Sequence, residues 1–135
     1  MRRGAGSYPG RGCVERDRKK KLAIAFHFLR GSQAGWKCDV CRKNGLERAR
    51  RCGWLEEAAR GPEVVVWARR GAQARECPRS LVTAESAAMV EEFLIWNLSG
   101  GRLRMGMMAR EAEAMLLLRQ ELEKEKLDDD RRGTN

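Results

Sequence analysis

The sequence predicts a small α+β protein in which a cysteine-rich knuckle and β-hairpin are followed by an α-helical hairpin. Four of the five cysteines lie within residues 38–77. Residues 63–68 are rich in β-branched and aromatic side chains, which favour a strand. Residues 84–98 and 108–127 carry apolar side chains at the period of a helix. Together these three observations predict the fold class.

The chain of 135 residues divides into four segments. Residues 1–35 are expected to form a basic, disordered N-terminal arm, because residues 1–21 offer almost no apolar side chain for burial. Within this arm, the apolar residues 22–29 fit either a short strand or a helix that docks on the domain. An extended translation start would also explain the arm. The other segments are a knuckle and hairpin at 36–80, a two-helix hairpin packed on it at 81–127, and a tail at 128–135.

The local signals for individual elements are clearest after the knuckle. The strand at residues 63–68 is followed by a turn at residues 70–72 that leads the chain back toward Cys77. Thr83 is a suitable N-cap for the helix at 84–98, which ends before two glycines. The helix at 108–127 is expected to be amphipathic. On its exposed side we expect two ion pairs, Arg119 with Glu123 and Glu121 with Lys124.

The four cysteines of residues 38–77 have the spacing Cys-x2-Cys, then two single cysteines. Two thiolates separated by two residues can bind one tetrahedral ion. The segment 36–80 is therefore predicted to be a zinc knuckle, and four thiolates would close the site and leave no position for catalysis. Only 6% of residues are aromatic, so the core is expected to be small and a structural Zn²⁺ would stabilise it. The predicted ligands are Cys38, Cys41, Cys52 and Cys77.

Other interpretations of the thiols stay open. Cys52 or Cys77 could be an ordinary buried thiol, and His27, the only histidine, could replace either as a ligand or simply be packed in its apolar segment. Cys38 and Cys41 could carry redox chemistry, although no βαβ pattern surrounds them and no helix is expected to start at Cys38. Cys13 is expected to be a free thiol.

The net charge of +9 is unevenly distributed. Residues 1–35 carry nine basic and two acidic side chains, residues 36–80 eleven and six, and residues 81–135 eight and eleven. An anionic partner would therefore meet the front of the chain. The alternative function is a zinc-containing nucleic-acid-binding protein, whose basic arm and knuckle face grip phosphate while Trp36 or Trp54 stacks a base. The residues of this face are Arg42, Lys43, Arg48, Arg50 and Arg51.

Four short stretches carry a resemblance to a known type of protein. They are residues 38–41 (Cys-Asp-Val-Cys), 51–54 (Arg-Cys-Gly-Trp), 65–68 (Val-Val-Trp-Ala) and 77–86 (Cys-Pro-Arg-Ser-Leu-Val-Thr-Ala-Glu-Ser). Over about two thirds of the chain, from Trp36 to about Leu127, the sequence resembles small phage and prophage proteins encoded among tail and assembly genes. The resemblance implies a non-enzymatic accessory or structural role in virion assembly, with other phage proteins as partners.

The expected function is thus a non-enzymatic, zinc-binding accessory protein that acts through protein contacts. With a single histidine, a Ser-His-Asp or Cys-His catalytic set would have to use His27, and nothing near it suggests one. No stretch approaches the roughly 20 apolar residues that cross a bilayer, so no membrane partner is expected. The reducing cytoplasm of a host cell, or the virion, is the expected location.

Overall fold

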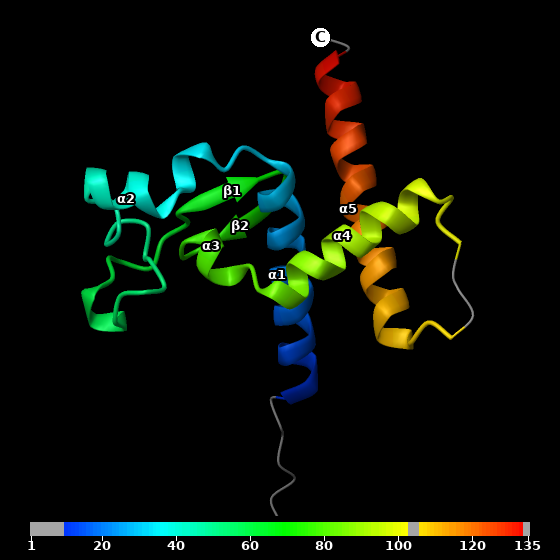
Figure 1. The fold of residues 1–135 in the computed structure, drawn as a ribbon, viewed down its shortest axis with the longest axis horizontal. Helices are drawn as coiled ribbons and strands as arrows, with labels where there is room; N and C mark the ends of the chain where they lie inside the picture. Colours follow the sequence, from blue (N-terminus) through cyan, green and yellow to red (C-terminus); the bar gives the residue numbers. More distant parts are fainter. Residues whose placement is uncertain (1–9, 103–105, 134–135) are drawn as a thin grey trace, which may run out of the picture.

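The computed structural model describes residues 10–102 and 106–133, with side chains from residue 16 onward, and shows helices around a small antiparallel hairpin (Figure 1). This agrees with the predicted α+β class. In chain order the elements are α1 (Gly10–Arg30), η1 (Ala34–Trp36), α2 (Cys38–Asn44), η2 (Glu57–Ala59), β1 (Trp67–Arg69), β2 (Ala72–Ala74), α3 (Pro78–Leu81), α4 (Ala84–Leu98) and α5 (Ala109–Gly133).

The structure corrects the expectation that residues 1–35 form a disordered arm, because Gly10–Arg30 make up the long helix α1. Residues 24–28 are at most 2% exposed and lie in the centre of the molecule. Helix growth is cooperative, so a well-packed C-terminal half lets the charged residues before it continue the helix at little cost. Asp17 and Lys21, one turn apart, add an ion pair at 3.2 Å. Residues 1–9 lie outside the described residues.

The core is formed where α1, α4 and α5 cross (Figure 1). Phe26 of α1 and Phe93 of α4 are fully buried and meet edge to face, with ring centroids 6.0 Å apart. The remaining buried members come from the same three helices: Ala25, Val90, Trp96, Met115, Leu118 and Leu122. The two C-terminal helices were expected to pack on the knuckle; in the structure their main apolar partner is α1.

The hairpin β1–β2 is shorter than the predicted strand at residues 63–68. Trp67 pairs with Ala74 and Arg69 with Ala72 around a turn at Arg70 and Gly71, both with positive φ. Only the Val66 N–H extends the ladder, by donating to the Ala74 carbonyl. The predicted turn is confirmed. Residues 63–65 form an exposed loop. Because β2 ends at Ala74, there is no neighbouring strand with which these residues could pair.

Two local predictions are confirmed in the C-terminal half. Helix α4 spans Ala84–Leu98 as expected, and the Thr83 side chain accepts a hydrogen bond from the Ser86 N–H in a reciprocal capping box. Helix α5 begins where expected but continues to Gly133, so residues 128–133 are helical where a tail was expected. Its last turns extend beyond the other elements (Figure 1). Asp129 binds Arg70 of the hairpin turn at 2.7 Å, which helps to anchor this extension.

Candidate functional site

The four predicted zinc ligands lie in the lobe formed by α2, the loop after it and the start of α3. Cys38 is the first residue of α2, Cys41 follows one turn later, and Gly45, with φ of 62°, ends the helix. The expectation that no helix starts at Cys38 was therefore wrong. The loop then returns through Cys52 and the hairpin to Cys77, the residue before α3.

The lobe has little regular structure and depends on Arg51 for its shape. This side chain is 7% exposed, donates to the Gly61 carbonyl and forms an ion pair with Glu57 at 2.5 Å. The backbone carbonyl of Arg51 also accepts a hydrogen bond from the Cys77 N–H, at 3.5 Å. Arg51 thereby links the loop to the residue that precedes α3.

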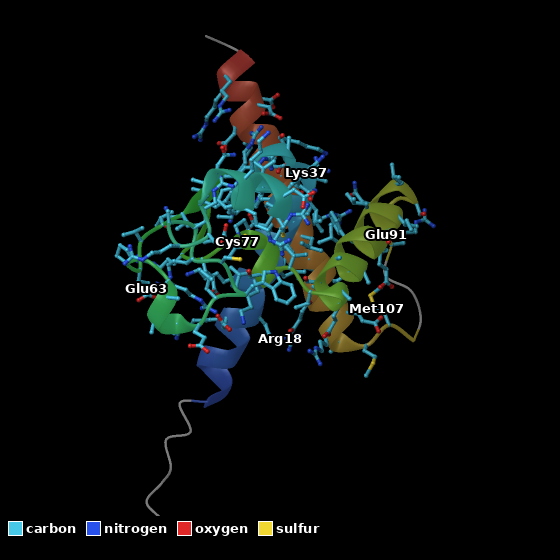
Figure 2. All side chains as sticks on the ribbon, turned by 60° about the vertical axis from the view of Figure 1, so that its left-hand side comes forward. Arg18, Lys37, Glu63, Cys77, Glu91 and Met107 are labelled. Atoms are coloured by element: carbon cyan, nitrogen blue, oxygen red, sulfur yellow. The ribbon has the colours of Figure 1, made fainter. Side chains whose placement is uncertain are left out.

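The four cysteines differ in burial. Cys41 and Cys77 are buried, Cys52 is half-buried and Cys38 is exposed, and all four are free thiols. Cys77 lies inside the molecule, whereas Lys37 and Glu63 lie on its outside (Figure 2). Burial raises the pKa of the Cys77 thiol, and the neighbouring thiols of Cys52 and Cys41 raise it further. Cys77 thus combines burial with the influence of two other thiols.

Backbone N–H groups act on Cys77 in the opposite direction. The backbone amides of Arg79 and Ser80, in the first turn of α3, lower the pKa of this thiol, although burial outweighs them. Such N–H donors stabilise a thiolate, which is the form that binds metal. Among residues 10–102 and 106–133, however, no group of three or more His, Cys, Asp or Glu side chains is arranged to hold a metal ion.

Arg50 connects Trp36 to the cysteine cluster. Its guanidinium lies 4.1 Å from the centroid of the Trp36 ring, and Nη1 donates to the Cys41 sulfur at 3.2 Å and to the Gly35 carbonyl. A positive group beside a sulfur compensates the negative charge of a metal-bound thiolate. The same contacts engage Arg50 and cover one face of Trp36.

The basic face of the alternative function is smaller than the sequence suggests. Arg42, Lys43 and Arg48 are exposed, but Arg50 and Arg51 are engaged inside the lobe. Trp54 is 84% exposed. Three of the five predicted phosphate ligands are therefore accessible.

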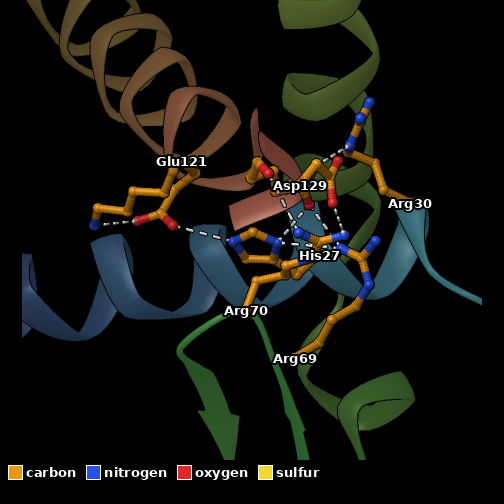
Figure 3. A network of polar contacts seen from close by, with 8 residues as sticks. His27, Arg30, Arg69, Arg70, Glu121 and Asp129 are labelled. Carbon is orange, nitrogen blue, oxygen red and sulfur yellow. Dashed lines mark hydrogen bonds and ion pairs between the residues drawn. The ribbon is translucent and has the colours of Figure 1, made fainter. Parts of the chain in front are cut away.

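His27 lies apart from these features, in a buried network that the sequence did not predict (Figure 3). Its ring is fully buried between two carboxylates of α5: Nε2 lies 3.0 Å from Glu121 and Nδ1 lies 2.9 Å from Glu125. Each ring nitrogen therefore lies within hydrogen-bond distance of a carboxylate. His27 is packed in its apolar segment, as one of our interpretations had it, and its polar contacts are two carboxylates and the guanidinium of Arg69.

Glu125 is the centre of the network. Besides His27 it accepts from Arg69 at 2.7 Å and from Arg30 at 3.2 Å. Burial by itself would raise the pKa of Glu125, but the hydrogen bonds from Arg69 and His27 and the charge of Arg30 outweigh it, so the pKa lies below its ordinary value. The network thus joins α1, β1 and α5.

A sequence signal for this network existed. Glu121, Glu125 and Asp129 recur every four residues, so they lie along one side of α5. We expected Glu121 to lie on the exposed side of the helix. It does bind Lys124, at 3.3 Å, but it is only 9% exposed. Arg119, also expected on that side, stacks on Trp96 at 5.0 Å.

The Cys13 side chain lies outside the described residues. Within residues 10–102 and 106–133, no helix has both the length and the apolar character needed to span a membrane. No protein-family model, no curated protein and no solved structure matches this chain.

Proposed function

We propose that this chain is a non-enzymatic zinc-binding protein that acts through protein contacts, with Zn²⁺ bound by Cys38, Cys41, Cys52 and Cys77. The observations that support the proposal are the burial of Cys41 and Cys77 in one lobe and the influence of the Cys41 and Cys52 charges on the pKa of the Cys77 thiol. These residues come from three separate segments of a lobe with little regular structure. A metal that joined them would stabilise that lobe.

Cys38 would complete the ligand set. It lies one helical turn before Cys41 and therefore on the same side of α2. Its side chain is exposed, so zinc binding requires it to rotate inward. Arg50 beside Cys41 and the backbone amides of Arg79 and Ser80 near Cys77 supply the positive environment that four thiolates around one Zn²⁺ require.

Metal analysis of protein purified without added zinc tests the proposal. We expect one zinc per chain in the wild type, and loss of both zinc and thermal stability in Cys77→Ser. Cys13→Ser is the matched control, because this cysteine lies outside the segment 38–77, and it should keep its zinc. Wild-type protein that contains no metal and gains no stability on addition of Zn²⁺ would contradict the proposal.

A role in phage tail structure or assembly stays a prediction that rests on the sequence resemblance. The zinc proposal does not depend on it. The test of the phage role is specific co-purification with neighbouring tail proteins in a co-expression experiment.

The alternative, nucleic-acid binding, is favoured by the exposed cations Arg42, Lys43 and Arg48. Three phosphate contacts give a slope of log affinity against log salt of about −3. Replacing all three by Ala should remove this slope if the alternative is correct. Absence of DNA and RNA binding near physiological salt would eliminate it.

A further inference from the structure

An apolar groove of about 500 Å³ lies between the middle of α1 and the N-terminal half of α5, over the start of α4. Its apolar lining is formed by Leu22, Leu81, Met89, Met108, Ala114 and Leu117. Leu22 and Met89 also pack against the buried core, so the lining is continuous with the core. None of the four cysteines of the lobe lines this groove. Its volume lies within the range of ligand-binding sites in proteins.

The two walls of the groove carry opposite charge. Arg18 and Lys19 lie on the α1 wall, and Glu111 and Glu113 on the α5 wall. In the part of the chain that the structure describes, none of these four side chains forms an ion pair with another residue. The other charged lining residues differ, because Lys21 binds Asp17 and Arg110 binds Glu85. The groove therefore offers unpaired cations on one side and unpaired carboxylates on the other.

We propose that this groove binds an amphipathic helix of a partner protein. The apolar side chains of that helix pack on the groove lining, its acidic side chains face α1 and its basic side chains face α5. The α5 positions at the groove, 110 to 117, span roughly 10 Å, which corresponds to about two helical turns of the partner. Met89 and Met108, whose flexible side chains adapt to different shapes, line the same groove.

The opposite charges of the walls favour a helix over other occupants. An acyl chain with an anionic head, or a nucleic acid, would be attracted by Arg18 and Lys19 but repelled by Glu111 and Glu113. A helix can carry both signs on the two flanks of one apolar stripe. The proposal goes beyond the proposed function by stating the chemistry of a partner, and it does not depend on zinc.

Stapled, fluorescently labelled helical peptides with a two-turn leucine stripe are suitable probes for the full chain. One peptide has Glu on one flank and Lys on the other, a second has Lys on both, and a third has Glu on both. We expect the mixed peptide to bind most tightly in fluorescence anisotropy. A peptide of the same composition with its leucines distributed around the helix should not bind.

Charge reversal on one wall changes the expected preference. Lys19→Glu cancels the unpaired charge of the α1 wall and should raise the affinity of the all-Lys peptide relative to the mixed peptide by about twofold to fivefold, whereas Glu113→Lys cancels that of the α5 wall and should raise the relative affinity of the all-Glu peptide to the same degree. Both residues are exposed, so the fold should persist, which circular dichroism checks. Ala114→Arg should reduce binding of every peptide at least tenfold. Glu123→Lys, on α5 outside the groove, is the control and should leave all affinities unchanged.

Two results would overturn the proposal. One is equal affinity for the mixed, all-Lys and all-Glu peptides, which would mean that the charged walls do not select a partner, or equally tight binding of the peptide with distributed leucines, which would mean that the groove does not recognise an apolar stripe. The other is binding of dodecyl phosphate, weakened by Lys19→Glu, with no binding of any peptide, which would identify an amphiphile site. Zinc content is measured separately, so failure of this proposal is distinguishable from failure of the zinc proposal.

Discussion

At the scale of single residues, Glu125 has the largest number of charged or ionisable partners in the described part of the chain. It is 4% exposed and lies against one imidazole and two guanidinium groups from two other elements. A buried carboxylate is costly unless it is paired, and here three partners satisfy it. Its removal would leave His27, Arg30 and Arg69 close together without the charge that holds them.

We therefore predict that Glu125→Gln lowers the free energy of unfolding by about 3 to 5 kcal/mol, the usual loss when one partner of a buried ion pair is removed. Urea denaturation of the purified protein measures this. Glu123→Gln, an exposed position on the same helix, should change stability by less than about 0.5 kcal/mol. Equal effects of the two changes would show that the network does not stabilise the fold.

The lowered pKa of Glu125 predicts a dependence of stability on pH. A carboxyl whose folded pKa lies below its unfolded pKa stabilises the protein above the unfolded value, and this stability is lost as pH falls through the folded value. We expect the urea midpoint to decrease as pH is lowered from about 5 toward the lowered pKa. In Glu125→Gln the urea midpoint should decrease less over the same pH range. If the midpoint of Glu125→Gln decreased as much as that of the wild type, the pH dependence would not come from Glu125.

At the scale of elements, the residues at the two ends of α4 determine where this helix begins and where it stops. Thr83 and Ser86 cap each other at its start, and Gly100 and Gly101 with positive φ follow its end. The Thr83 hydroxyl accepts from an N–H that would otherwise lack a partner within the helix. The helix is thus positioned for packing against α1 and α5.

Thr83→Ala should lower the free energy of unfolding by about 1 kcal/mol, because it removes the oxygen that caps α4. Thermal or urea denaturation measures this change. Thr83→Ser keeps the oxygen and is the matched control. A Thr83→Ala protein as stable as Thr83→Ser would mean that the cap contributes nothing.

At the scale of the whole molecule, α1 unites the two halves of the chain. Its apolar face packs on α4 and α5, and its C-terminal end reaches the hairpin, where Phe28 meets Trp67 at 5.9 Å between ring centroids. The segment that composition marked as an arm is therefore the central helix of the fold. The proposed groove and the buried network both include residues of α1.

Phe26→Ala should lower the free energy of unfolding by about 3 to 5 kcal/mol, because it opens a cavity between α1 and α4. Leu127→Ala, a 59% exposed position on α5, is the control and should have a small effect. Chemical denaturation of both proteins gives the comparison. A stable Phe26→Ala protein would show that α1 is not part of the core.

Within the cysteine lobe, the sequence predicts which residues could bind a metal but not how they are arranged. Spacing alone indicates that Cys38 and Cys41 share one side of a turn, because they are three residues apart. It does not reveal that Arg50 faces Cys41 or that Cys38 is exposed while Cys77 is buried. Those features depend on how the loop between α2 and the hairpin folds back.

The sequence by itself determined what local chemistry controls: both ends of α4, the turn at Arg70 and Gly71, and the start of α5. Only the tertiary structure decided that residues 10–30 form a central helix, that the strand stops near Val66 and that His27 meets Glu121 and Glu125. Caps and turns are set by neighbours within a few residues. Burial of a charged helix, the length of a strand and the pairing of a buried histidine depend on partners far along the chain, which no local pattern contains.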